Sequence, residues 1–155
     1  MKPEKLYHYT TGIYLRSIVK DGLLKVSHYD KSIGAKHPAV WFSVNPIWEP
    51  TATKVTPGKT GIRFLTKEEQ FDMFGLGRIT VAYTDEFLTW GKYRHMCKND
   101  RNFPPHTLDE MERVGYKKGS DPKHWYCSIK DIGKHRWLNS ELWDGQNWLP
   151  YENPE

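Results

Sequence analysis

Seven short segments of the chain have the composition or alternation of β-strands, and irregular stretches separate most of them. They span residues 6–10, 39–43, 62–65, 78–83, 125–129, 137–143 and 147–149. The segment 78–83 alternates most clearly, because Ile79, Val81 and Tyr83 share one face. This order lacks the regular strand–helix alternation of a doubly wound sheet. It predicts an α+β fold of two short, curved, mostly antiparallel sheets with a few short helices.

The first strand segment runs directly into a helical pattern. Leu6, His8 and Thr10 share one face of the predicted strand, because strand side chains alternate with a period of two. A threonine at position 10 or 11 can cap the helix that follows, and Gly22 can end it. The pattern therefore predicts a β-turn-α unit in which His8 lies beside a hydroxyl group at a strand-to-helix junction.

In the rest of the chain, residues typical of turns and helix caps indicate where loops and helices lie. Residues 28–38 and 47–61 are rich in polar residues, Gly and Pro, and are expected to form loops. Thr66 and Glu69 form a capping box that starts a short helix, and Thr107 and Glu110 form a second one before a helix that ends at Gly115. A further helix is expected over residues 85–96. Before the last strand, residues 144–145 read as a tight turn.

Length and charge limit the organisation of the chain. At 155 residues it fits a single domain spanning residues 1–155. Seven Trp, nine Tyr and six Phe make its apolar content aromatic, which suits both a small core and a stacking pocket. The net charge of +4 is small, so any attraction to phosphate must come from local patches.

The sequence contains no secretory signal pattern and no apolar run of membrane-spanning length, so a cytoplasmic protein without a membrane partner is expected. Cys97 and Cys127 are too few for a disulfide framework. His95 and His124 lie close to these cysteines, but neither pair has a familiar zinc-site spacing. We therefore expect no metal.

Several common chemistries find no support in the motifs. The glycines at positions 75 and 77 lack both the lysine-hydroxyl ending of a phosphate loop and the spacing of a dinucleotide fingerprint. The serines at positions 43, 128 and 140 lack the glycines of a nucleophile elbow. No pair of carboxylates is spaced as in a glycosidase. Three features remain as candidates for a functional site: a histidine on the first strand, a hydroxyl after an aromatic strand and an acid on a late strand.

In these remaining features the chain resembles the ADP-ribosyltransferase family. The resemblance rests on Tyr7-His8-Tyr9-Thr10, followed by a helix and Gly22, and more loosely on Trp41-Phe42-Ser43. It implies an ADP-ribosyltransferase-like fold. In that family the first-strand histidine bonds the adenosine ribose, an aromatic ring stacks on nicotinamide, and a late glutamate orients the ribose at the bond that breaks.

Carried over by position, the resemblance gives His8 a catalytic and cofactor-binding role and gives Glu141 the role of catalytic acid. The remaining cofactor-binding residues that it implies are Tyr9, Thr10, Trp41, Phe42 and Ser43. No glutamate stands at the start of the strand that contains Trp125, where many members have their acid, and Glu49 is the second choice. Each residue also has a structural interpretation, as part of the core or of the solvated surface.

The resemblance implies an enzyme that uses NAD as a substrate. It would transfer ADP-ribose to a macromolecular acceptor, a protein or a nucleic acid, and release nicotinamide. The first alternative is a catalytically inactive module of the same fold that binds a nucleotide or a nucleic acid. A second alternative is the related RNA phosphotransferase chemistry, which also consumes NAD.

Overall fold

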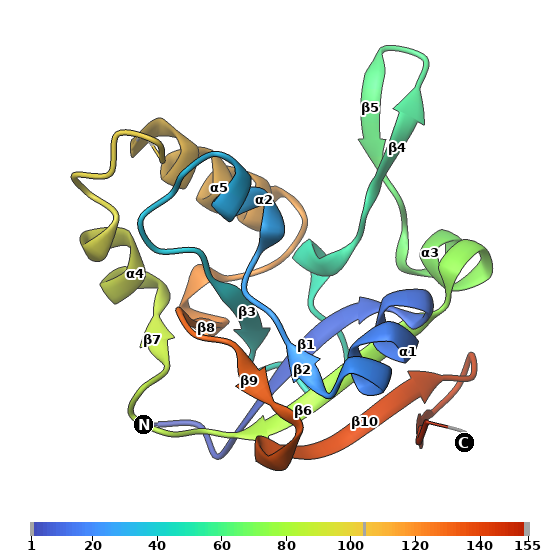
Figure 1. Cartoon of the computed structure of the whole chain (residues 1–155). Helices are drawn as coiled ribbons and strands as arrows, with labels where there is room; N and C mark the ends of the chain where they lie inside the picture. Colours follow the sequence, from blue (N-terminus) through green and yellow to red (C-terminus); the bar gives the residue numbers. More distant parts are fainter. Residues whose placement is uncertain (1, 104, 154–155) are drawn as a thin grey trace.

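A computed structural model describes residues 2–103 and 105–153 (Figure 1). The strands are β1 (Lys5–Thr11), β2 (Leu23–Leu24), β3 (Val40–Ser43), β4 (Val55–Gly58), β5 (Gly61–Phe64), β6 (Leu76–Ala82), β7 (Leu88–Thr89), β8 (Trp125–Ser128), β9 (Ile132–Gly133), β10 (Trp137–Trp143) and β11 (Trp148–Pro150). The α-helices are α1 (Gly12–Asp21), α2 (His28–Ser32), α3 (Lys67–Phe74), α4 (Trp90–Met96) and α5 (Pro105–Lys117). Single 3-10 turns form η1 (Pro50–Ala52), η2 (Pro122–His124) and η3 (Lys134–Arg136).

One seven-stranded sheet, in the order β11-β10-β6-β1-β3-β8-β7, forms the centre of the fold. Every strand pair is antiparallel, which confirms the α+β class and the antiparallel pairing predicted from the sequence. The prediction of two short sheets was wrong in number, because β1 and β3 join the two halves. They pair at a single position, Tyr7 opposite Ser43. Two small ribbons, β2–β9 and β4–β5, stand apart from this sheet.

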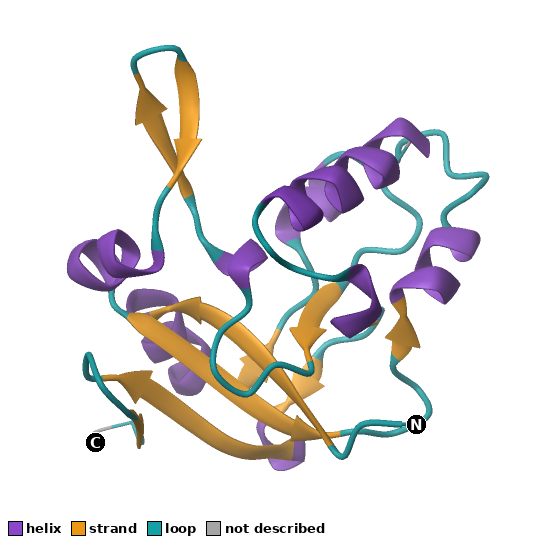
Figure 2. Cartoon of the chain, turned by 180° about the vertical axis from the view of Figure 1, so that it is seen from behind, coloured by secondary structure: helices purple, strands orange, loops and turns teal. Residues whose placement is uncertain are grey.

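Helices cover the two halves separately. Helix α1 lies against the half that contains β1, β6 and β10, whereas α2, α4 and α5 gather around the half that contains β3, β7 and β8 (Figures 1 and 2). The β4–β5 hairpin projects away from both. The two halves nevertheless share a buried core, because Leu6 of β1 packs in the same cluster as Val40 and Phe42 of β3.

The β-turn-α unit at the start of the chain is confirmed. The Thr11 hydroxyl accepts a hydrogen bond from the Tyr14 backbone N–H (3.1 Å) and caps α1. Gly22 ends the helix with φ of +67°, a left-handed conformation that glycine adopts without a steric penalty. Its N–H bonds the carbonyl groups of Ile18 and Val19. Local cap chemistry thus sets both ends of α1.

Other local predictions had mixed outcomes. The capping box of Thr66 and Glu69 starts α3, as expected. The second one does not start a helix, because α5 begins two residues before Thr107 and continues past Gly115. The helix expected from residue 85 begins only at Trp90, where the Thr89 hydroxyl caps α4. The expected loop at residues 28–38 contains α2. The expected loop at residues 47–61 contains η1 and most of the β4–β5 hairpin.

Aromatic side chains fill much of the interior, as their abundance suggested. One buried cluster packs Trp90, Tyr93, Phe103 and Trp125 around two free, buried cysteines at positions 97 and 127. Burial raises the pKa of both thiols. Over residues 2–103 and 105–153, no helix has the length and apolar character needed to cross a membrane.

Candidate functional site

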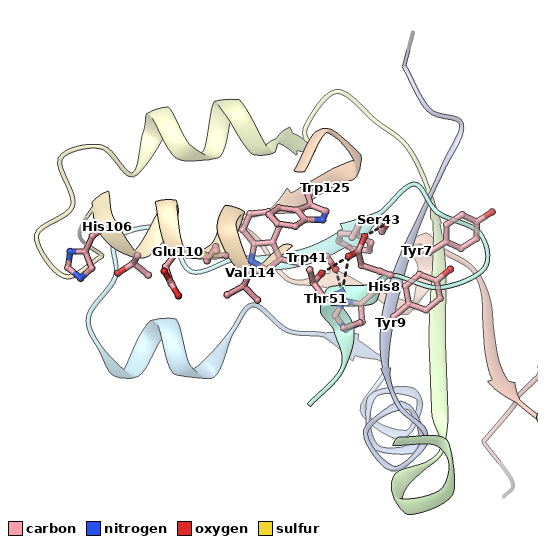
Figure 3. Close-up of a pocket in the computed structure, with 15 residues that line it drawn as sticks. Tyr7, His8, Tyr9, Trp41, Ser43, Thr51, His106, Glu110, Val114 and Trp125 are labelled. Atoms are coloured by element: carbon pink, nitrogen blue, oxygen red, sulfur yellow. Dashed lines mark hydrogen bonds between the residues drawn. The ribbon is translucent and has the colours of Figure 1, made fainter. Parts of the chain in front are cut away.

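A cavity of about 530 Å³ opens where the two halves of the sheet meet α5 (Figure 3). Small-molecule sites commonly have volumes between about 300 and 1,000 Å³. Most of its wall is aromatic or aliphatic, with few polar groups. The lining residues come from β1 (Tyr7, His8, Tyr9), β3 (Trp41, Phe42, Ser43), the following turn (Glu49, Thr51, Ala52), α5 (His106, Thr107, Glu110, Met111, Val114) and β8 (Trp125).

Glu49 places a buried carboxylate in the wall of this cavity. The residue is 8% exposed, and its side chain accepts four hydrogen bonds. One oxygen, Oε1, accepts from the Ser43 hydroxyl (3.0 Å). The other, Oε2, accepts from the Thr51 N–H (3.0 Å), the Thr51 hydroxyl (2.6 Å) and the Ser120 hydroxyl (2.7 Å). Neutral donors therefore hold the carboxylate, and the described residues form no ion pair with it.

The distribution of these bonds leaves one oxygen available. A carboxylate has about four acceptor positions, two on each oxygen. Oε2 already accepts three hydrogen bonds, whereas Oε1 accepts one. Oε1 thus has the remaining capacity to accept a hydrogen bond from a ligand in the cavity.

Local sequence explains how Glu49 comes to this position. Its side chain caps η1, in which Pro50 takes the first position, where the absent N–H of proline costs nothing. Ser43 ends β3, and its hydroxyl also accepts from the Asn45 N–H (3.1 Å). Because Ser43 is only 1% exposed, its hydroxyl serves to hold Glu49 and to close the turn.

A second chain of hydrogen bonds supports the same carboxylate from behind. The indole N–H of Trp125 donates to the Ser120 hydroxyl (2.9 Å), which in turn donates to Glu49. Trp125 is 6% exposed and opens β8. The Trp125 indole and the Ser120 hydroxyl thus each donate to an acceptor within the protein, so these buried polar groups are satisfied without water.

His8 contributes an imidazole in its neutral form. Its Nδ1 lies 2.7 Å from the Trp41 carbonyl oxygen, and since a carbonyl only accepts, Nδ1 carries the proton. Burial outweighs this bond and lowers the pKa of His8 to about 4. At neutral pH, Nε2 therefore bears a lone pair, and no hydrogen bond among the described residues occupies it. It can accept a hydrogen bond from a ligand hydroxyl.

The two aromatic residues of β3 differ in their surroundings. Trp41 is partly exposed and packs edge-on against Tyr93 of α4 (4.9 Å between ring centroids). Phe42 is 3% exposed and packs against His8 (5.8 Å) and Phe87 (5.2 Å). Trp41 accordingly has the more accessible ring of the two.

Six of the eight residues named from the sequence meet in this cavity. They are His8, Tyr9, Trp41, Phe42, Ser43 and, as the second choice of acid, Glu49. Thr10 is buried and is not part of the lining. Glu141 also lies outside it, on β10, where its Oε1 accepts a hydrogen bond from Arg78 Nε (2.8 Å). The structure therefore does not bring the first-choice acid to the site.

Sequence reasoning missed the residues that complete the site. Thr51 follows Glu49 at the short spacing of a capping turn, which was a readable local signal. Ser120, Trp125 and the α5 residues carry no such signal, since only the tertiary fold brings them to Glu49. Among the described residues, no group of three or more His, Cys, Asp or Glu side chains is placed to hold a metal ion.

Comparison of the chain with protein-family models, with curated proteins and with solved structures finds no match.

Proposed function

We propose that the protein binds NAD in this cavity and transfers ADP-ribose to a macromolecular acceptor, with release of nicotinamide. The observation that carries the proposal is the meeting of His8 with an aromatic wall and the buried Glu49 carboxylate in one cavity. These are the three kinds of group that the resemblance to ADP-ribosyltransferases implies. The acid is Glu49 in place of Glu141. Use of NAD also fits the cytoplasmic location expected from the sequence.

Each group has a role in the proposed reaction. His8 Nε2 accepts a hydrogen bond from a ribose hydroxyl, and the Trp41 ring stacks on the electron-poor nicotinamide. The bond between ribose C1′ and the nicotinamide nitrogen breaks, and nicotinamide leaves with the electron pair. C1′ then bonds to the acceptor atom, which loses its proton to water. Glu49 Oε1 stabilises the positive charge that develops on the ribose.

The experiment measures nicotinamide release from NAD in the presence of a cell extract that supplies acceptors. Glu49→Gln is expected to lower kcat by at least about 100-fold, as the loss of a charge-stabilising group commonly does. Glu68→Gln, an exposed change on α3, serves as the matched control and leaves the rate unchanged. Glu141→Gln should cost far less than Glu49→Gln, because the glutamine oxygen still accepts from Arg78. A larger loss in Glu141→Gln would contradict the assignment of the acid.

One observation favours the alternative of a binding module. Glu49 lies in a turn after β3, and not on a late strand as in the family that the chain resembles. A module of this kind binds NAD saturably, with His8→Ala weakening the binding, and releases no nicotinamide. Calorimetric titration with NAD shows whether the protein binds NAD at all, which both functions require. The absence of any NAD binding would refute the relation to ADP-ribosyltransferases.

A further inference from the structure

The loop that connects β3 to Glu49 is fixed by side chains from three different strands. The Tyr9 hydroxyl of β1 donates to the Asn45 carbonyl. The Arg78 guanidinium of β6 donates to the next carbonyl, that of Pro46. The Trp148 indole N–H of β11 donates to the one after it, that of Ile47 (3.2 Å). Three consecutive carbonyl groups thus have three separate side-chain donors.

Arg78 is the central member of this set. Its guanidinium lies between the rings of Tyr7 (5.1 Å to the centroid) and Trp148 (4.7 Å). Its Nε donates to Glu141 (2.8 Å), and both side chains are about one-seventh exposed. The planar, forked guanidinium can serve a carboxylate and a carbonyl at once, which a lysine ammonium on a flexible stem does less well. Glu141 therefore fixes the orientation in which Arg78 reaches the loop.

The end of the loop is fixed by packing. Trp48 is 8% exposed, and its ring centroid lies 5.0 Å from that of Tyr9. The Lys67 ammonium lies over the indole, 5.9 Å from its centroid. Glu49 follows Trp48 directly. Its carboxylate is therefore placed from two sides: through the backbone of residues 44–48, and by the hydroxyl groups that bond it.

We propose that Tyr9, Arg78 and Trp148 form a clamp on residues 44–48 that positions Glu49, with Glu141 acting through Arg78. Its effect on turnover rests on the proposed function, but its effect on the loop does not. In this arrangement Arg78, Trp148 and Glu141 are positioning residues. None of the three lines the cavity itself, and they contact its lining only through Tyr7, which Arg78 covers, and Tyr9, whose ring lies 5.8 Å from that of Trp148.

The first test is amide hydrogen exchange by NMR on wild type, Arg78→Met and Trp148→Phe. Both variants keep much of the packing and remove a donor to the loop. We expect the Thr51 and Ala52 amides, which bond Glu49, to exchange at least about tenfold faster in the variants. Amides in the centre of β1 and β6 should keep wild-type exchange rates.

Two matched controls separate the clamp from general loss of stability. Arg136 also pairs with a glutamate, Glu86, and lies over an aromatic ring, that of Phe87 (5.7 Å). Trp137 donates its indole N–H to the Ile132 carbonyl at 3.2 Å, the distance of the Trp148 bond. Arg136→Met and Trp137→Phe should leave exchange of the Thr51 and Ala52 amides unchanged. Equal acceleration in controls and clamp variants would overturn the proposal.

The second test is kinetic. Arg78→Met should lower kcat for nicotinamide release about 10- to 100-fold, the effect of misplacing a reacting group by about 1 Å. KM for NAD should change by less than about twofold, because His8 and the aromatic wall remain in place. A rise in KM with unchanged kcat would refute the positioning role. If wild type releases no nicotinamide, the proposed function fails, and the exchange experiment alone still decides whether the clamp exists.

Discussion

Gly115, in the last turns of α5, lies directly against the indole ring of Trp125. A Cβ atom at position 115 would come within 2.5 Å of two ring carbons, Cη2 and Cζ2. The same indole donates to Ser120, which bonds Glu49. Close approach of a helix backbone to one ring thus helps to set the position of the cavity carboxylate.

Gly115→Ala is expected to lower the free energy of unfolding by about 1–3 kcal/mol, because the added methyl group overpacks a rigid ring. Gly91→Ala in α4 is the control, since the nearest atom to its Cβ is 4.0 Å away. There alanine should be neutral or stabilise the helix by up to about 1 kcal/mol. Urea unfolding measures both changes. Equal stabilities of the two variants would show that the indole moves aside freely.

Ser120→Ala removes two hydrogen bonds at once. The Trp125 indole N–H and Glu49 Oε2 each lose a partner within a buried network. We expect the free energy of unfolding to fall by about 1–3 kcal/mol, the cost of leaving buried polar groups unpaired. Ser32→Ala, which removes an exposed hydroxyl bonded to the Tyr29 carbonyl, should stay within about 0.5 kcal/mol of wild type. Chemical denaturation of both variants at neutral pH provides the comparison.

His8 makes stability depend on pH in a defined direction. Its native pKa of about 4 lies below the value of 6.5 for an unperturbed histidine, so the unfolded state binds more protons between these two values. The contribution of His8 to stability is complete above about pH 6.5 and declines as the pH falls towards 4. Between pH 7 and pH 4.5, wild type should lose about 2–3 kcal/mol more than His8→Gln. Parallel losses in the two proteins would mean that His8 titrates normally in the folded state.

The β4–β5 hairpin is expected to be dispensable for folding. Almost all of its residues are exposed, and the Leu65 N–H bonds the Lys54 carbonyl (2.8 Å) across its base. Replacing residues 55–64 with a two-residue Asn-Gly turn should change the free energy of unfolding by no more than about 1 kcal/mol. Circular dichroism and thermal unfolding check the fold. Loss of cooperative unfolding would show that the hairpin supports η1 and the cavity wall.

Local chemistry made the β1-α1 unit readable from sequence, because Thr11 and Gly22 act through backbone groups only a few residues away. The same reasoning failed where distant packing decided the outcome. The glycine at position 115 reads as the end of a helix, yet it lies inside α5 because it makes room for Trp125. Likewise, Thr107 and Glu110 have the spacing of a capping box, but the helix had already begun.

The sequence predicted the site residues on β1 and β3, but it did not identify which glutamate lines the cavity. His8 and Ser43 belong to segments that the sequence predicts as strands, the first from its alternation and the second from its β-forming residues. The choice between Glu49 and Glu141 depended on which of them reaches the cavity. Strand order and register decide this, and single-sequence patterns do not carry that information. Glu141 instead faces Arg78 across the β6–β10 pair.

Although β1 and β3 share a single residue pair, one buried cluster joins the two halves of the sheet, with Leu6 of β1 packed in the same core as Val40 and Phe42 of β3. Among the described residues, Tyr7 opposite Ser43 is the one ladder pair between β1 and β3, and the His8 bond to the Trp41 carbonyl also joins these strands. Any compound that fills the cavity touches both halves. Such a compound therefore adds contacts between the halves where the backbone ladder supplies a single pair.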